Sequence, residues 1–312
     1  MSCVVVGSVN VDFDRQVDAD TVARLDADLA VPDAGETRVV ATPPPGFDGD
    51  VTLGGKGANQ AVAAAQAGAE TTLCGAVGRD ASAFDLRSRL AAVGVDTRLA
   101  TRGDHTGAAY VWVAPDGENR IALRPGANGQ LTPDDTRQHR QLAREADVVL
   151  VQNEVPVAAT TALLDELAVA ETPPTVVVDP APADGAAPLV AHPAVDVCVP
   201  NETEFDTLRP ALATAHRRGL TVVRTEGADG ASVFDGSESA IEADSAAAVS
   251  TRPTFRVDAP SVGVVDTTGA GDALAGSLAA TLCDGAGMET AVTRGVRVGS
   301  RACRHAGATD AV

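Results

Sequence analysis

Lysine and aromatic residues are nearly missing from this chain of 312 residues. It has a single lysine, Lys56, and aromatic residues make up 3% of the sequence. Acidic residues outnumber basic ones by 43 to 24, so the net charge is −19. Such a field repels nucleic-acid backbones and anionic lipid, which argues against a protein that binds nucleic acid or a membrane. A surface rich in Asp and poor in Lys predicts a salt-adapted, halophilic protein of the cytoplasm, with an ordinary acidic enzyme as the alternative.

The sequence also lacks the signs of disulfides, zinc sites and membrane spans. Its five cysteines show no CxxC or Cys/His spacing, so we expect small apolar core residues in a reducing compartment. No stretch approaches the ~18 apolar residues of a membrane helix. Met1 runs directly into the apolar segment 3–7 without a charged leader. These absences predict a soluble, intracellular protein, and 45% apolar residues can supply its core.

Short β-branched segments alternate along the chain with segments rich in Ala and Leu. This rhythm predicts an α/β fold, a mostly parallel sheet covered by helices on both faces, in one domain over residues 1–312. Two segments, approximately 12–53 and 107–124, interrupt it with turn residues and alternating runs. We expect them to form a small β-sheet lid over a site, with strands that pair with a second copy in a homodimer. The expected strands and helices are 4–6, 71–77, 148–152, 176–179, 195–199 and 221–225, and 58–67, 160–169 and 273–282.

The strongest chemical signal is the segment 266–272, Asp-Thr-Thr-Gly-Ala-Gly-Asp, followed by a helix of small residues. Backbone amides of Gly269, Ala270 and Gly271 at a helix N-terminus can face an anion, and Asp272 lies in the first turn. An anion hole beside a carboxylate suits phosphoryl transfer, since the Asp can accept a hydroxyl proton. A glycine-rich turn with an acidic residue is the structural alternative.

A second glycine cluster, Gly54-Gly55-Lys56-Gly57-Ala58-Asn59-Gln60, opens an Ala-rich helix. It is not a Walker A loop, because Gly57 follows the lysine where that motif requires Ser or Thr. Its glycines let the backbone approach a ligand closely, and Lys56 and Asn59 add polar groups that suit hydroxyls. A dinucleotide-binding oxidoreductase is disfavoured, because no GxGxxG follows the first strand.

Both motifs, in this order and separation, resemble the signatures of the ribokinase family, the phosphofructokinase-B carbohydrate kinases. The matching segments are 54–68 and 266–276, and the resemblance extends over nearly the whole chain. It implies a kinase that uses ATP, Mg²⁺ and a monovalent cation such as K⁺ to phosphorylate a pentose. The favoured acceptor is ribose, phosphorylated at its terminal hydroxyl. The alternatives are ribose 1-phosphate or a nucleoside as acceptor and, more remotely, a non-catalytic sugar-binding regulator.

The resemblance also implies roles for individual residues. Asp272 would be the base, with the amides of residues 269–271 as the anion hole. Glu204 would order Mg²⁺ through water, while Asp266 and Thr268 would belong to the monovalent-cation loop. The residues implied to bind the sugar are Asn10, Asp12, Gly54, Gly55, Lys56, Asn59, Glu154 and Asp272. Those implied to bind the nucleotide are Asn201, Thr225, Gly227, Gly269 and Gly271.

The sequence departs from the family pattern in three places. The lid segment is longer than usual, and the chain ends at Val312 without the usual terminal helix. Arg120 and Arg124 lie in the expected lid hairpin, where a neutral sugar needs little positive charge. Four residues apart on a strand, they share one face, so they would hold a substrate phosphate if that face looks into the site. If it looks outward, they offset the lid's carboxylates.

Overall fold

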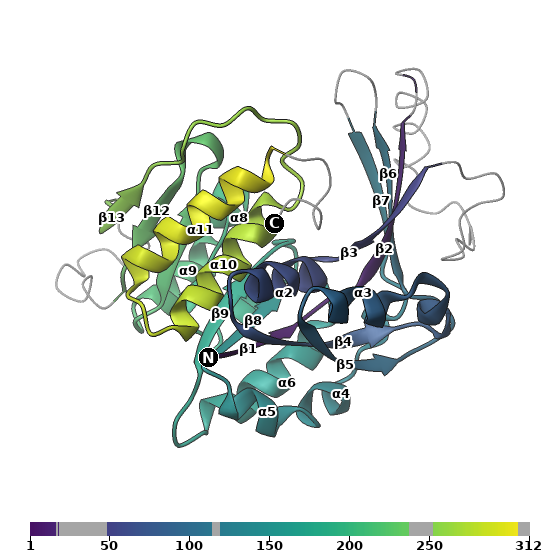
Figure 1. The fold of residues 1–312 in the computed structure, drawn as a ribbon. Helices are drawn as coiled ribbons and strands as arrows, with labels where there is room; N and C mark the ends of the chain where they lie inside the picture. The colour runs from purple at the N-terminus through teal and green to yellow at the C-terminus, as the bar shows by residue number, and fades with distance from the viewer. Residues whose placement is uncertain (17, 19–48, 114–118, 237–251, 305–312) are drawn as a thin grey trace.

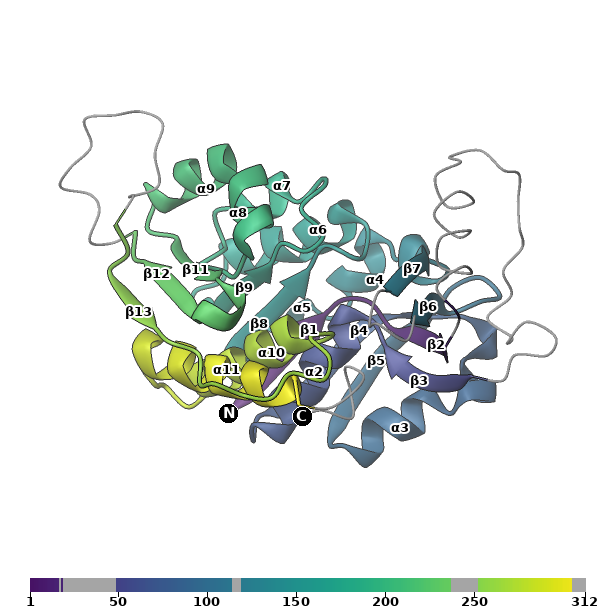
Figure 2. The ribbon, with the colours of Figure 1, turned by 90° about the horizontal axis from the view of Figure 1, so that it is seen from above.

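A large twisted sheet between two layers of helices forms the body of the protein, and a small sheet projects from it (Figures 1 and 2). The computed structural model describes residues 1–16, 18, 49–113, 119–236 and 252–304. The expected α/β architecture with a separate small sheet is confirmed. The centre of the predicted lid segment 12–53, the lid turn and the connection 237–251 lie outside the described residues.

Nine strands form the large sheet, in the order β13-β12-β11-β10-β9-β8-β1-β4-β5. Neighbours from β11 to β5 pair in parallel, whereas β12 and β13 pair antiparallel at one edge. The strands are β1 (Ser2–Val6), β4 (Glu70–Val77), β5 (Val95–Thr101), β8 (Val148–Gln152), β9 (Thr175–Asp179), β10 (Val197–Cys198), β11 (Thr221–Thr225), β12 (Ala231–Phe234) and β13 (Phe255–Val257).

Both faces of this sheet are buried, which explains the unbroken apolar runs in its central strands. In β1, Cys3 and Val5 belong to one core cluster, while Val4 and Val6 belong to the other. The helices on the first face are α2 (Lys56–Gln66), α3 (Leu86–Ala92), α10 (Ala270–Cys283) and α11 (Met288–Ala302). Those on the second are α4 (Pro133–Arg137), α5 (Arg140–Glu145), α6 (Val157–Ala168), α7 (Ala187–Val190), α8 (Glu202–Thr207) and α9 (Arg209–His216).

The small sheet has the strand order β3-β2-β6-β7 and stands at one end of the body (Figure 1). Within this sheet, Phe13 on β2 stacks on Tyr110 on β6 with ring centroids 5.0 Å apart. Phe13 also meets Phe84 of the body edge-on at 6.1 Å, and this contact joins the small sheet to the body. The strands are β2 (Asn10–Gln16), β3 (Asp50–Gly54), β6 (Gly107–Val113) and β7 (Asn119–Arg124). Short 3₁₀ helices are η1 (Arg79–Phe84), η2 (Asn128–Gln130) and η3 (Gly227–Asp229).

The cysteines behave as the sequence predicts. Cys3, Cys74, Cys198 and Cys283 are free and buried, and Cys303 is half-buried. Burial raises the pKa of the Cys74 thiol to about 12. Among the described helices, none combines the length and the apolar character that a membrane span requires.

Candidate functional site

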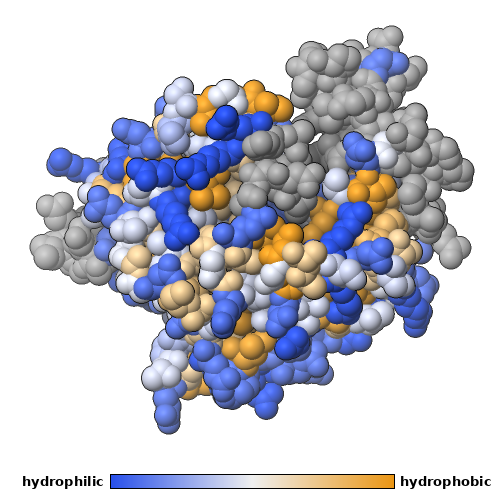
Figure 3. All heavy atoms as spheres, viewed as in Figure 1, coloured by the Kyte–Doolittle hydropathy of each residue, from blue (hydrophilic) through white to orange (hydrophobic). Residues whose placement is uncertain are grey.

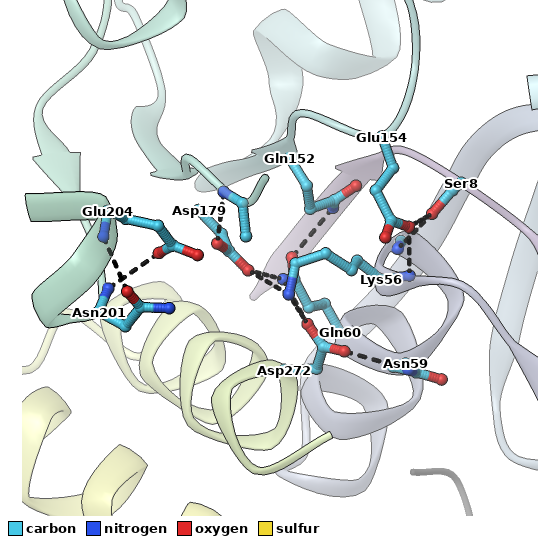
Figure 4. A network of polar contacts seen from close by, with 12 residues as sticks. Ser8, Lys56, Asn59, Gln60, Gln152, Glu154, Asp179, Asn201, Glu204 and Asp272 are labelled. Carbon is cyan, nitrogen blue, oxygen red and sulfur yellow. Dashed lines mark hydrogen bonds and ion pairs between the residues drawn. The ribbon is translucent and has the colours of Figure 1, made fainter. Parts of the chain in front are cut away.

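Several polar residues gather at the carboxyl edge of the parallel strands, among them Asn10, Glu154 and Asn201, which the sequence analysis singled out. Ser8 and Asn10 follow β1, Glu154 follows β8, Asp179 ends β9 and Asn201 follows β10. The N-termini of α2 and α10 meet the same edge (Figure 4). Ligands bind preferentially at this edge of open α/β sheets.

Asp272 is the centre of a buried hydrogen-bond network (Figure 4). The residue is 5% exposed. Lys56 Nζ lies 2.9 Å from Oδ1, Gln60 Nε2 donates to Oδ1 at 3.0 Å, and Asn59 Nδ2 donates to Oδ2 at 3.1 Å. All three donors come from the first turns of α2, so the two glycine motifs meet at one carboxylate.

A second carboxylate, Asp179, shares two of these three donors, Lys56 and Gln60. Its Oδ2 lies 3.1 Å from Lys56 Nζ and accepts from Gln60 Nε2 at 2.6 Å. Gln152 Nε2 donates to Gln60 Oε1 at 2.9 Å, which orients the Gln60 amide toward both carboxylates. Burial raises the pKa of Asp179, against the opposing effect of the Lys56 charge. Burial acts to lower the pKa of Lys56, but Asp179 and Asp272 hold it well above its usual value, so the ammonium stays charged.

Glu154 closes the other side of the site. Its Oε2 accepts from Ser8 Oγ at 2.5 Å and from the Lys56 backbone amide at 3.1 Å, at the start of α2. Burial raises the pKa of Glu154, and these hydrogen bonds oppose the rise. Gly57 lets Ser8 lie close to the start of α2, because a Cβ at position 57 would lie 2.6 Å from the backbone nitrogen of Ser8. The packing of the segment after β1 against α2 therefore depends on glycine at this position.

Asn201 and Glu204 form a capping box at the start of α8. The Asn201 amide donates to Glu204 Oε2 and the Glu204 amide donates to Asn201 Oδ1, both at 2.9 Å. Burial raises the pKa of Glu204, helped by the charges of Asp179 and Asp272. Asn201 and Glu204 therefore cap α8, and Glu204 also faces the carboxylate cluster (Figure 4).

A cavity of about 570 Å³ opens beside this network. The predicted sugar-site residues Asn10, Lys56 and Glu154 line it, together with Arg124 of the lid and Glu204, which was predicted to order Mg²⁺. The volume is in the usual range for small-molecule sites. The structure therefore brings together residues that lie up to about two hundred positions apart in the chain.

The lid contributes Asn10 and Asp12 on β2. Asn10 Oδ1 accepts from Asn128 Nδ2 at 2.8 Å, and Asn128 also bonds both backbone groups of Val9. Asp12 lies directly against Gly54 of the neighbouring strand, where a Cβ would come within 1.9 Å of the Asp12 carboxylate. Both side chains are thereby held by close neighbours.

The loop before α10 contains the remaining predicted residues. The Thr268 amide donates to Asp266 Oδ1 at 2.8 Å, and Gly269 has a φ of 75°, the left-handed turn from which the helix starts. Ala270 is half-buried and Gly271 is exposed, so ligands can reach this helix start. Thr225 makes a β-bridge to Asn201, and Gly227 is exposed with a φ of 55°.

Sequence reasoning assigned no role to four residues that organise the site. These are Ser8, Gln60, Asn128 and Asp179. Gln60 follows Lys56 by one helical turn, and Asp179 ends a predicted strand at the same edge, so position alone offered a signal. Of the two lid arginines, Arg124 lines the cavity, whereas the side chain of Arg120 lies outside the described part.

No cluster of three or more His, Cys, Asp or Glu side chains suited to a metal ion occurs in the described ranges. The pair Asp179 and Glu204 still offers the carboxylate oxygens that Mg²⁺ prefers. Burial and, after it, the negative charge of Asp179 raise the pKa of Glu204. A bound cation would relieve this repulsion between the two carboxylates. The residues thus fit a metal whose other ligands come from water and a bound nucleotide.

Comparison with known proteins places the chain in a family. The ribokinase of Bacillus subtilis is 32% identical over 270 residues, which is 84% of this chain and 82% of that protein. A bifunctional ribokinase/ribose-5-phosphate isomerase A of Fructilactobacillus sanfranciscensis is 33% identical over 89% of this chain, which spans 48% of that longer protein. Among solved structures, the ribokinase of Thermotoga maritima superimposes with a TM-score of 0.76 at 26% identity, covering 100% of this chain and 96% of that one.

An Arabidopsis thaliana ribokinase solved with ribose and ATP has the same TM-score of 0.76, at 26% identity, covering 100% of this chain and 95% of that one. The family model of the pfkB carbohydrate kinases matches residues 2–312. The resemblance seen in the two glycine motifs therefore extends to the whole chain and to its fold. The chain belongs to the pfkB family of carbohydrate kinases.

Proposed function

We propose that this kinase transfers the γ-phosphoryl group of ATP to ribose and forms ribose 5-phosphate. The observation that carries the proposal is Asp272, a carboxylate 5% exposed at the start of α10, beside a cavity lined by hydroxyl-binding residues. Relatives named ribokinase, one of them solved with ribose and ATP, support the choice of acceptor and donor.

In this proposal Asp272 accepts the proton of the terminal hydroxyl. Lys56, Asn59 and Gln60 orient its carboxylate, so the lone pairs point in a fixed direction before the sugar arrives. The amides of residues 269–271 point out of the N-terminus of α10, where backbone N–H groups and the helix dipole stabilise negative charge on the moving phosphoryl group. Base and anion hole therefore lie on consecutive residues.

The sugar would lie in the cavity between the body and the lid. Asn10 and Asp12 would accept or donate hydrogen bonds to hydroxyls from the lid side, and Lys56, Asn59 and Glu154 from the body side. Gly54 and Gly55 lie between these groups and leave room for the ring, since Gly55 has a φ of 89° and no side chain. Positioning of this kind supplies much of the rate in phosphoryl transfer.

The nucleotide would extend from the anion hole toward Asn201, Thr225 and Gly227. Glu204, with Asp179 nearby, would hold Mg²⁺ through water. When bound, this ion neutralises charge on the phosphate oxygens. Glu204 keeps Asn201 in place by the capping box, so a Glu204→Gln substitution should lower the affinity for Mg²⁺ while preserving α8.

Three finer assignments complete the proposal. Asp266 and Thr268 would form a K⁺ loop behind the anion hole, so turnover should be faster in KCl than in NaCl at matched ionic strength.

The outer strands of the lid would pair two copies of the chain, since Leu123 on β7 is 58% exposed. Sedimentation should then give twice the chain mass of 31.4 kDa. The cytoplasm remains the expected location.

One observation favours a second acceptor. Arg124 is exposed and lines the cavity together with Lys56, and it makes no ion pair with any side chain in the described part. A guanidinium there suits a phosphate on the substrate, as in ribose 1-phosphate. Arg120 lies four positions earlier on the same strand, β7.

The deciding experiment measures ADP release with ribose, ribose 1-phosphate and nucleosides, for the wild type and for Arg124→Ala. A ribose kinase turns over ribose with a kcat/KM that the substitution leaves unchanged. A kinase of ribose 1-phosphate prefers that substrate and loses about 2 kcal/mol of transition-state stabilisation in Arg124→Ala. Asp272→Asn is the control for a contaminating kinase. Absence of ADP release with every acceptor in the wild type would overturn both proposals.

A further inference from the structure

A groove of about 890 Å³ runs between α2 and α11 on the outer surface of the helix layer. It shares no lining residue with the cavity of the catalytic site. Gln66 and the end of α2 form one wall, and the exposed side of α11 forms the other. Figure 3 shows strongly hydrophilic side chains gathered over α11 on this face.

Four arginines line the α11 wall: Arg294, Arg297, Arg301 and Arg304. Their spacing of three and four residues places them on one side of the helix, and each is exposed. Like charges at this spacing repel and destabilise a helix. The chain has only 24 basic residues and a net charge of −19, so four arginines within eleven positions form a basic cluster on an otherwise acidic protein.

Most of these four arginine charges have no ion-pair partner in the described part of the chain. Arg294 donates to the Ala67 carbonyl at 2.8 Å and lies 3.8 Å from Asp284, so it ties α11 to the end of α2 and sets the width of the groove. Arg297, Arg301 and Arg304 make no ion pair with the rest of the described chain. Glu289 is the single carboxylate among the lining residues.

We propose that this groove binds a small-molecule anion that carries two or more phosphate groups. Guanidinium groups hold phosphate oxygens in pairs, and hydroxyls of Thr290 and Thr293 add donors along the same wall. The stretch from Arg294 to Arg301 covers about 10 Å of helix, more than one phosphate reaches, and Arg304 follows just beyond the helix end. The volume suits a metabolite rather than an extended polymer.

The geometry also connects the groove to the catalytic site without overlap. Its two walls are the helices that flank α10, and α10 carries Asp272. α2 begins at Lys56 and reaches the groove about two to three turns later, at Ala63 and Gln66. An anion bridging both helices is therefore a ligand separate from the two substrates.

The test is calorimetric titration of the full chain with tripolyphosphate and pyrophosphate at low ionic strength. The groove variant is Arg297→Gln/Arg301→Gln. The matched control is Arg217→Gln/Arg218→Gln, which removes the same charge from exposed positions near the end of α9. We expect the groove variant to weaken tripolyphosphate binding at least tenfold, and the control variant to bind as the wild type does.

Steady-state kinetics separates this site from the nucleotide site, because the groove variant should keep the KM for ATP. Equal binding by wild type and groove variant would overturn the proposal. So would an equal loss in both variants, which would show a net-charge effect, or a loss accompanied by a raised KM for ATP. Sedimentation adds a last outcome: a wild-type dimer that the groove variant converts to monomer would assign the groove to a second copy instead. None of these readouts depends on which sugar is phosphorylated.

Discussion

The body and the lid hold their functional residues in different ways. In the body, Asp272 and Asp179 are 5% exposed and share donors from one helix, in a network that spans α2, β8, β9 and α10. In the lid, Arg124 is exposed and Leu123 beside it is 58% exposed. A site built on rigid, buried elements is precise, while an exposed sheet edge tolerates change. From this comparison we expect reaction chemistry to depend on the body and acceptor choice to depend more on the lid.

The lid is nonetheless anchored where it leaves the body. Val11, Phe13, Ala108 and Tyr110 belong to the same core cluster as α2 and α10. Asn10 is 7% exposed and bonded to Asn128. The two regions therefore share a buried boundary. The following predictions test the contrast between body and lid.

The largest effect is expected for Asp272→Asn in the body. The amide keeps the shape and the hydrogen bond to Lys56 but cannot accept the hydroxyl proton. We expect kcat to fall by roughly 10²- to 10⁴-fold, the range for a positioned general base, with nucleotide affinity unchanged. Stopped-assay turnover and ADP titration measure the two quantities. Turnover near that of the wild type would remove Asp272 from the mechanism and weaken the contrast with the lid.

Lys56→Met tests the electrostatic balance of the body. Without the ammonium, Asp179 and Asp272 remain buried and repel each other. We expect a loss of about 2 to 3 kcal/mol in unfolding free energy at neutral pH, less than for a fully buried pair because 22% of the Lys56 side chain is exposed. Arg79→Met is the matched control, since its ion pair with Asp104 is exposed and should contribute little.

The same variant predicts a pH dependence. The folded-state pKa of Asp179 is raised mainly by burial, and loss of the Lys56 charge raises it further. A raised carboxyl pKa favours the folded state below the unfolded pKa of about 4, and this advantage is lost as the pH rises through the folded pKa. The deficit of Lys56→Met should therefore shrink as the pH falls from 8 toward 4. Denaturant melts at several pH values measure it, and a constant deficit would contradict the ion-pair account.

Gly54→Ala tests the boundary between lid and body. The new Cβ would lie 1.9 Å from the Asp12 carboxylate, so that side chain must move. We expect the KM for the sugar to rise about tenfold, the loss of one hydrogen bond, with a smaller change in kcat. Gly287→Ala is the control, because a Cβ there meets nothing within 4 Å. An equal fall in kcat would place Asp12 in the chemistry rather than in acceptor binding.

The smallest effect is expected for salt, which acts on the whole surface. With a net charge of −19, dilute buffer strengthens self-repulsion, and added KCl screens it. The melting temperature should rise by a few degrees from dilute to molar KCl, equally in NaCl. A flat melting temperature would refute salt adaptation. A rise confined to KCl would instead point to the cation loop at Asp266.

Much of the fold follows from local patterns, although element ends do not. The apolar run 148–152 coincides with β8, and the predicted helix 58–67 appears as α2 but begins two residues earlier, at Lys56. Gly55 in a positive-φ turn lets the helix start there, a conformational choice that residue type alone leaves open. The expected strand 195–199 is reduced to Val197–Cys198, close to Pro200, which cannot donate to a neighbouring strand.

The sequence by itself determined the α/β class, the two glycine-led helix starts and the candidacy of Asp272, because each depends on residue type and short-range spacing. The tertiary structure alone decided that Lys56 meets Asp272 across 216 positions, that Gln60 joins it to Asp179, and that Arg124 looks into the cavity. It also assembled the arginine groove from two helices far apart in the chain. Such contacts are set by how helices pack on a buried sheet, and no local pattern carries that information.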